Sequence, residues 1–298
     1  MGVRAFDNRL KILAVLILSV PMGVISVGIR SAQAQIREGK GKGKQKQAAF
    51  PYGRYKEVLT KYVDEKGMVD YRALKANREA LDRFVRSLGE LEKGTYRTWE
   101  KEAKIAFLIN AYNAITLRII VEHYPIKSGF FGSLKWPDNS IRQIDGAFDG
   151  IEHRVMGRKM TLDEIEHETL RKDFNEPRIH LALVCAAMSC PRLRREPYVA
   201  LRLDEQFAEQ ARHFVRQPDN FRIDRRKNRV YLSEIFKWFG EDFIQTHGTE
   251  AKFGGIPPKK RAVLNYLSRH VSKRDRTYLT AADYRVKYLD YDWTLNEQ

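Results

Sequence analysis

The sequence predicts a mostly helical α+β domain with a small antiparallel or mixed sheet. Three observations support this fold class. Apolar side chains recur every three or four positions throughout residues 99–124, several shorter segments repeat that helical spacing, and only a few short segments have the pattern of strands. The 298-residue chain is 43% hydrophobic and 11% aromatic, which is enough for a core and excludes wholesale disorder.

Each element follows from a local pattern. The longest helix ends before Pro125 because proline disfavours helical backbone in the residue that precedes it. Thr161 and Glu164 have the spacing of a capping box, which begins a helix that runs to about Arg171. We therefore expect helices over residues 52–63, 73–91, 99–124, 162–171, 203–215 and 257–271 and after Ser233, with strands over 178–184, 229–232 and 284–293.

Residues 1–34 have the features of a secretory signal peptide. Arg4, Arg9 and Lys11 precede an apolar run over residues 12–29, and the small residues of an Ala-x-Ala cleavage site end at Ala34. Cleavage near Ala34 would place the chain in the periplasm or outside the cell. The alternative is an uncleaved inner-membrane anchor formed by residues 12–29, which is about the minimum length for a span.

Residues 35–49 form a basic linker that is rich in glycine and lysine. This composition is typical of a flexible tether. The linker and the formal charge of +16 also suit contact with an anionic envelope polymer or lipid surface. Nucleic acid is not an expected partner, because the chain has an export signal and no recognisable nucleic-acid module. Residues 50–298 are expected to form one globular domain.

The most suggestive chemistry lies between His180 and Pro191. A disulfide between Cys185 and Cys190, a catalytic thiol and an inert buried thiol all remain open. In an extended chain His180 and Cys185 would lie about 16 Å apart, so a pair of them needs a turn. Other histidines are also available as a base, namely His153, His167, His213, His247 and His270.

Several polar residues elsewhere are candidates for a site. Asn110 and Asn113 share a face of the longest helix, where they either brace the backbone or, with Tyr112, contact a ligand. Glu166 is a candidate acid that orients a histidine, and as an inward carboxylate it needs a partner such as Arg171, Arg192 or His180. No phosphate-binding loop or metal-binding motif is present, so we expect no cofactor and no metal.

Five motifs in order resemble a known family. They are Val69-Asp70-Tyr71, residues 106–114, Ile165-Glu166-His167, His180 to Leu183 with Ser189-Cys190-Pro191, and residues 289–293. Together they resemble the domain of unknown function family 547 (DUF547) over about residues 50–295. This domain is in turn distantly similar to papain-like and transglutaminase-like cysteine enzymes. That resemblance implies a cysteine nucleophile with a histidine on a later strand, a place that His180 fits, although the early helix offers Asn110 and Asn113 and no cysteine.

Two functions follow from these features, and whether the chain is an enzyme stays open. The first is a non-catalytic or ligand-binding domain of the cell envelope, with Asn110, Tyr112, Asn113 and His180 around a pocket or bracing the core. The alternative is a thiol-dependent hydrolase or acyl transferase that acts on an amide or ester. In that enzyme Cys185 or Cys190 would be the nucleophile, His180 the base and Glu166 or Asn113 the orienting group, and the basic surface would favour acidic substrates.

Overall fold

The computed structural model describes residues 50–127, 135–281 and 283–298. The expected signal peptide over residues 1–34, its cleavage site near Ala34 and the alternative anchor over residues 12–29 lie outside the described residues. The basic linker over residues 35–49 lies outside them as well.

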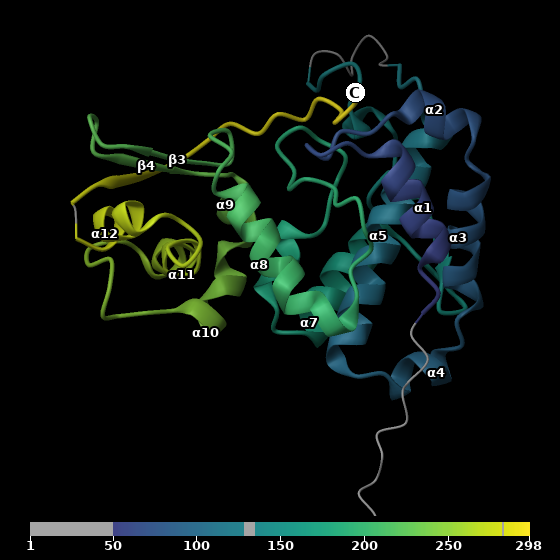
Figure 1. Ribbon diagram of the computed structural model, residues 1–298, viewed down its shortest axis with the longest axis horizontal. Coiled ribbons are helices and arrows are strands. Elements are labelled where there is room, and N and C mark those ends of the chain that lie inside the picture. The colour runs from purple at the N-terminus through teal and green to yellow at the C-terminus, as the bar shows by residue number, and fades with distance from the viewer. Residues whose placement is uncertain (1–49, 128–134, 282) are drawn as a thin grey trace, which may run out of the picture. The chain divides into compact units, whose positions relative to one another are not determined.

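Helix α5 (Lys101–His123) is the centre of the larger of two hydrophobic cores. Nearly every side chain from Ile105 to Val121 is buried, so this stretch of the helix is enclosed around its whole circumference. Helices α2 and α3 pack directly against it, and α1 packs against both of them (Figure 1). The helices of this part are α1 (Gly53–Tyr62), α2 (Tyr71–Ala76), α3 (Glu79–Glu90), α4 (Lys93–Thr98) and α5.

By length and composition alone, α5 would suffice to cross a membrane. It is the one such helix in the described part of the chain, and 89% of its most apolar stretch is buried inside the protein. A helix enclosed by other parts of its own domain passes the same test of length and hydropathy as a membrane span.

The second core lies between a small sheet and the helices of the C-terminal part. Phe214, Phe236 and Phe243 pack in it with Val230 and Leu232 of the sheet. Its helices are α8 (Leu203–Phe214), α9 (Ile235–Phe239), α10 (Ile244–His247), α11 (Pro258–Leu267) and α12 (Lys273–Ala281).

The three-stranded sheet is mixed, one of the two arrangements that the sequence left open. Strand β4 (Arg229–Leu232) lies in the middle, antiparallel to β3 (Phe221–Asp224) and parallel to β5 (Arg285–Tyr288). The predicted strand over residues 229–232 is confirmed, whereas the predicted final strand over residues 284–293 is shorter than expected. Leu232 lies opposite both Phe221 and Tyr288, which fixes the register of all three strands.

A hairpin and a short, irregular helix add to the larger core. Strands β1 (His153–Val155) and β2 (Arg158–Met160) form the antiparallel hairpin. The predicted capping box of Thr161 and Glu164 is present and begins α6 (Leu162–Ile165). The chain then widens into a π-helical turn over Glu166–Leu170 and returns to α-helix in α7 (Arg171–Asp173).

Two predicted elements are wrong. The expected helix over residues 73–91 is broken into α2 and α3, and Asp70 caps the first of them by accepting a hydrogen bond from the Ala73 N–H. The expected strand over residues 178–184 is instead a 3₁₀ turn over Pro177–Leu181, which Pro177 begins and the Glu176 side chain caps. Hydrophobic periodicity cannot distinguish a short buried strand from a short buried turn of helix.

The end of the chain returns from the sheet to the larger core (Figure 1). Leu295 pairs with Ala187, and Val69 pairs with Glu297. The Tyr71 hydroxyl donates a hydrogen bond of 2.7 Å to Oδ1 of Asn296. Residues 291–297 therefore connect segments that lie far apart in the sequence.

Two buried amides of α5 hold two other segments by their backbones. Asn110 donates to the carbonyl of Tyr198 at 2.8 Å and accepts from its N–H at 2.9 Å. Asn113 donates to the Ala182 carbonyl at 3.0 Å and accepts from the Val184 N–H at 2.9 Å. The spacing of three residues places both amides on one face of the helix, as predicted from the sequence.

We expect Asn110→Ala to lower the free energy of unfolding by about 2–6 kcal/mol, measured by urea denaturation. The substitution leaves both backbone groups of Tyr198 buried without their partner, and each such loss costs about 1–3 kcal/mol. The matched control is Asn175→Ala, because Asn175 is exposed, and its effect should stay within about 0.5 kcal/mol. Equal, small effects of the two substitutions would show that the Asn110 amide does not brace the fold.

Candidate functional site

A cavity of about 520 Å³ lies among α5, α6 and its π turn, α9, the segment around the cysteines and the last residues of the chain. It is lined by all four predicted catalytic residues, Glu166, His180, Cys185 and Cys190, and by Tyr112. Asn110 and Asn113 do not line it, and both sides of each amide are bonded to backbone, as the bracing alternative expects. The remaining lining residues include Arg142, Asp145, Phe148, Asp149, Asp163, His167, Trp238, Phe239, Tyr291 and Trp293.

Glu166 is placed in this cavity by the π-helical turn. The capping box fixes the start of α6, and the wider turn begins at Glu166 itself. Turns of this kind inside α-helices occur often at functional sites. Glu166 is only 8% exposed, and the hydroxyl of Tyr112 donates a hydrogen bond to its carboxyl.

Burial controls the protonation of Glu166. Removal from water raises the pKa of its carboxyl to about 7, although the hydrogen bond from Tyr112 and the charge of Arg171 act in the opposite direction. The cavity therefore contains a carboxyl that is present in both protonation states near neutral pH. Such a group can donate or accept a proton under those conditions.

His180 lies behind Glu166 and is fixed by two contacts. Its Nε2 is 2.7 Å from Oδ2 of Asp242, and its ring stacks on that of Phe239 with centroids 4.2 Å apart. Because the carboxylate of Asp242 can only accept, Nε2 carries the proton and Nδ1 presents a lone pair. Nδ1 has no hydrogen-bond partner and lies 3.7 Å from Oε1 of Glu166.

Asp242 is itself held by Arg171. The guanidinium forms two hydrogen bonds with the carboxylate, at 2.7 and 2.9 Å. Burial alone would raise the pKa of Asp242, but the hydrogen bonds from Arg171 and His180 outweigh it and lower that pKa. Burial lowers the pKa of His180 despite the neighbouring carboxylate, so the imidazole is neutral near pH 7. Of the expected partners of Glu166, His180 is adjacent, whereas Arg171 binds Asp242.

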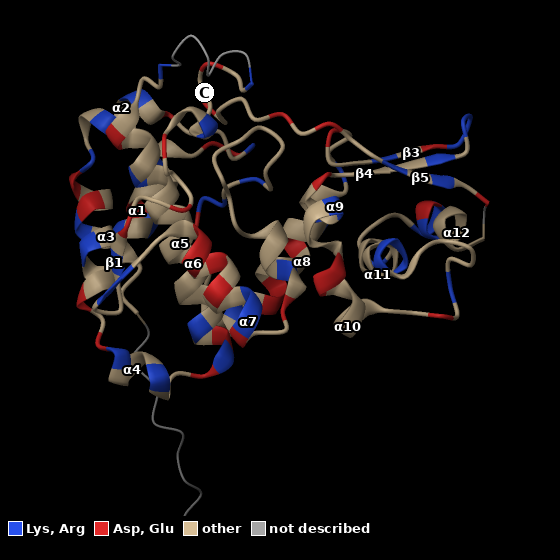
Figure 2. Ribbon diagram, turned by 180° about the vertical axis from the view of Figure 1, so that it is seen from behind, with Lys and Arg blue, Asp and Glu red and all other residues tan. Residues whose placement is uncertain are grey.

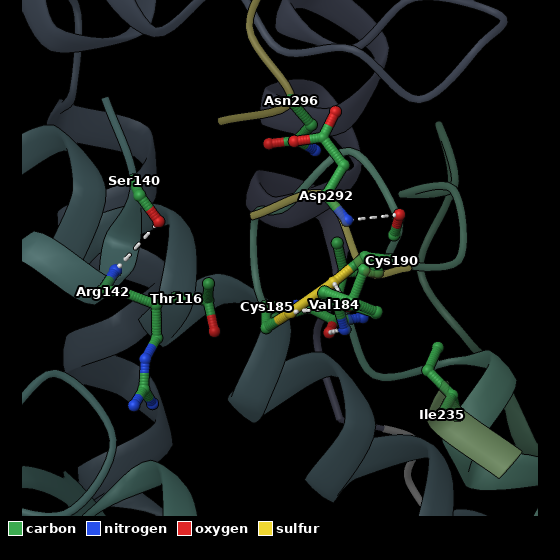
Figure 3. Close-up of a disulfide and its surroundings, with 12 residues drawn as sticks. Thr116, Ser140, Arg142, Val184, Cys185, Cys190, Ile235, Asp292 and Asn296 are labelled. Carbon is green, nitrogen blue, oxygen red and sulfur yellow. Dashed lines mark hydrogen bonds between the residues drawn. A yellow bond between two sulfur atoms is a disulfide. The ribbon is translucent and has the colours of Figure 1, made fainter. Parts of the chain in front are cut away.

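The two cysteines form a disulfide (Figure 3), and both line the cavity. Their Cα atoms are 6.4 Å apart, within the range that a disulfide needs. The hydroxyl of Tyr291 lies 3.3 Å from Sγ of Cys185 and 3.1 Å from Sγ of Cys190. His180 does not form a hydrogen bond with either sulfur in the described structure, because Nε2 is bonded to Asp242 and Nδ1 has no partner.

Acidic side chains outnumber basic ones in the cavity wall. Four carboxyl groups line it, and acidic residues follow one another along α6 and the π turn (Figure 2). Burial raises the pKa of Asp163 and lowers that of His167, so His167 is neutral near pH 7. Arg142 is the one Arg or Lys among the described lining residues. The carboxyl groups are those of Asp145, Asp149, Asp163 and Glu166.

A protein-family model described as a protein of unknown function, DUF547, matches residues 96–215. These residues belong to the DUF547 family. No curated protein and no solved structure matched the chain. The DUF547 segment contains α5, the π turn, His180 and both cysteines. Asp242, Trp238 and Tyr291 lie beyond it, so the cavity is built from the DUF547 segment and from later residues.

Sequence reasoning missed Asp242 and the aromatic wall. Asp242 follows an aromatic run with no local feature that separates it from its exposed neighbour Glu241. Tyr291 and Trp293 line the cavity and lie in the motif over residues 289–293, whose resemblance to DUF547 is the one sequence signal that points to them. In the part of the chain that the structure describes, no cluster of three or more His, Cys, Asp or Glu side chains could hold a metal ion.

We expect Glu166→Gln to stabilise the protein at pH 8 by up to about 3 kcal/mol and to change its stability little at pH 4, measured by urea denaturation. The folded state holds the proton of Glu166 more tightly, since its pKa is about 7 instead of 4.5. Stability from this group is therefore complete below pH 4.5 and is lost as the pH rises through 7, at about 1.4 kcal/mol per unit.

Glu168→Gln is the control for this titration. Glu168 lies in the same π turn, but it is exposed and paired with Lys172. Its substitution should give no gain in stability at pH 8. A Glu166→Gln variant whose difference from the natural protein is the same at both pH values would contradict the raised pKa.

Proposed function

We propose that this chain is an exported ligand-binding domain whose cavity takes a small organic cation with an apolar body. The observation that carries the proposal is the pairing of a buried carboxyl, Glu166, with an aromatic wall. Export is supported by the signal-peptide features of residues 1–34. The cavity volume of about 520 Å³ lies within the range of small-molecule sites.

The charge of the cavity favours a cation. Four carboxyl groups line it, against the single guanidinium of Arg142, while the whole chain has a formal charge of +16. An ammonium group beside Glu166 would favour its ionised form and offset the cost of its burial. An anionic ligand would have to approach this carboxyl, and the nearby guanidinium of Arg171 is already paired with Asp242.

The aromatic wall suits the same ligand. Trp238 and Trp293 stack with ring centroids 6.0 Å apart, and Tyr291 lies 4.7 Å from Trp293. The guanidinium of Arg142 lies 5.3 Å from the Trp293 ring and 5.7 Å from the Phe148 ring. A cation of the chain itself therefore lies over the faces of these rings, and aromatic faces attract cations within about 6 Å.

We expect 2-phenylethylamine to bind the oxidised protein saturably and 3-phenylpropionate, which has the same ring and the opposite charge, to bind far more weakly. Binding is read from the tryptophan fluorescence, because Trp238 and Trp293 line the cavity. The amine affinity should rise roughly tenfold between pH 6 and pH 8, as Glu166 ionises around its pKa of about 7.

The variant Glu166→Gln distinguishes binding of the amine in this cavity from general attraction of the amine to an acidic surface. It should lower the amine affinity at pH 8 by about tenfold, since one charge-assisted interaction of about 1.5 kcal/mol is lost, and it should remove the dependence on pH. Glu168→Gln should leave both unchanged. Equal binding of the amine and the carboxylate would overturn the proposal.

A second function is favoured by one specific observation, namely that Glu166, His180, Cys185 and Cys190 line the same cavity. After reduction, a cysteine there could act as the nucleophile of a hydrolase or acyl transferase on an amide or ester. This is the chemistry that a distant similarity to papain-like or transglutaminase-like enzymes implies. A proton from the thiol would reach His180 by way of Glu166. The Nδ1 atom of His180 faces Glu166, whereas its Nε2 atom is already bonded to Asp242.

If this second function holds, one cysteine of the reduced protein should react with iodoacetamide at pH 7 much faster than the other. The faster thiol would have a lowered pKa, as catalytic thiols do. Labelling is followed by intact mass and peptide mapping. Slow and equal labelling of both cysteines would count against a thiol-dependent enzyme and leave the ligand-binding proposal unaffected, since that binding is measured on the oxidised protein.

A further inference from the structure

We propose that the Cys185–Cys190 disulfide is a redox couple that exchanges with a small dithiol entering the cavity, with Cys185 as the sulfur attacked and Cys190 as the leaving thiolate. This activity does not depend on the ligand-binding proposal. It rests on the contacts of the two sulfurs and of the backbone between them.

The two sulfurs differ in access. Cys185 is half-buried and Cys190 is only 7% exposed, and both line the cavity. A reagent that enters the cavity therefore meets Cys185 first. Because thiol–disulfide exchange requires direct attack on one sulfur, access decides which sulfur is attacked.

The surroundings of Cys190 suit a leaving thiolate. The backbone N–H of Cys185 donates to Sγ of Cys190 at 3.0 Å, and the Tyr291 hydroxyl lies 3.1 Å from the same atom. Burial raises the pKa of Tyr291, so its hydroxyl keeps its proton and can donate it in a hydrogen bond to the thiolate. Two donors to one sulfur stabilise its anion and make it a better leaving group.

The exchange balances in two steps. A thiolate of the dithiol attacks Sγ of Cys185, the S–S bond breaks, and Cys190 leaves as a thiolate. The second thiolate of the reagent then attacks the reagent sulfur of this mixed disulfide and releases Cys185 as a thiolate. The dithiol is oxidised to a disulfide by two electrons, the protein disulfide is reduced, and the two protons lost by the reagent are taken up by the two cysteines.

The backbone around the cysteines is held without the S–S bond. Asn113 accepts from the Val184 N–H. Ser189 donates its N–H to the carbonyl of Asp292 at 3.1 Å, and its Oγ accepts from the N–H of Asp292 at 2.9 Å. Met188 donates to the carbonyl of Thr294 at 2.8 Å. Reduction of the disulfide can therefore leave the fold in place. A reversible redox couple requires this, whereas a structural cross-link does not.

The test is the reduction of the folded full-length chain by dithiothreitol at pH 7, stopped by acid, followed by alkylation of free thiols and intact mass. We expect complete reduction without unfolding, which far-UV circular dichroism monitors. Tyr291→Phe should slow the reduction roughly tenfold, since it removes one hydrogen bond to the leaving thiolate.

Tyr284→Phe is the matched control. It removes a buried hydroxyl bonded to the Leu279 carbonyl, among residues that do not line the cavity, so it should leave the rate of reduction unchanged. Reduction that occurs only when the protein unfolds would identify a structural cross-link and overturn the proposal. A Tyr291→Phe variant that is reduced as fast as the natural chain would overturn the assigned role of Cys190 as the leaving group.

Discussion

The hydrogen bonds of two buried amides on α5 are the interaction on which the site depends. Asn110 and Asn113 lie on a helix that is enclosed on all sides, so their polar groups must find partners inside the protein. Asn113 finds them in the backbone between His180 and Cys185. The segment that carries the imidazole and the disulfide is thus fixed against the most deeply buried element of the larger core.

Next to this support, the three titratable groups Asp242, His180 and Glu166 lie in a row and differ in protonation. Arg171 and His180 keep Asp242 ionised, and Asp242 keeps the proton of His180 on Nε2. The unprotonated Nδ1 then faces Glu166, whose pKa burial has raised. The two carboxyl groups on either side of this neutral imidazole therefore differ in protonation near neutral pH, because Glu166 is more deeply buried and only Asp242 is hydrogen-bonded to the Arg171 guanidinium.

Local patterns predicted the parts of the fold that local interactions determine. The long helix, the capping box at Thr161 and the strand over residues 229–232 all follow from short-range spacing. The partners that complete the site come from distant segments: Asp242 is 62 residues from His180, and Tyr291 is 106 residues from Cys185. No local pattern marks such contacts. The turn over Pro177–Leu181 has the apolar pattern of a strand, because burial on all sides hides the periodicity that separates the two.

The path of residues 291–297 has a consequence for the order of events during synthesis. These residues supply Tyr291 and Trp293 to the cavity and pair with segments near residues 69 and 187, and Asn296 binds Tyr71 across 225 positions. A ribosome that has made everything up to β5 has therefore made a chain whose cavity still lacks a wall. Closing so long a loop is slow compared with forming a helix, so we expect this wall to form after the helices and to leave Glu166 and the cysteines open to water until then.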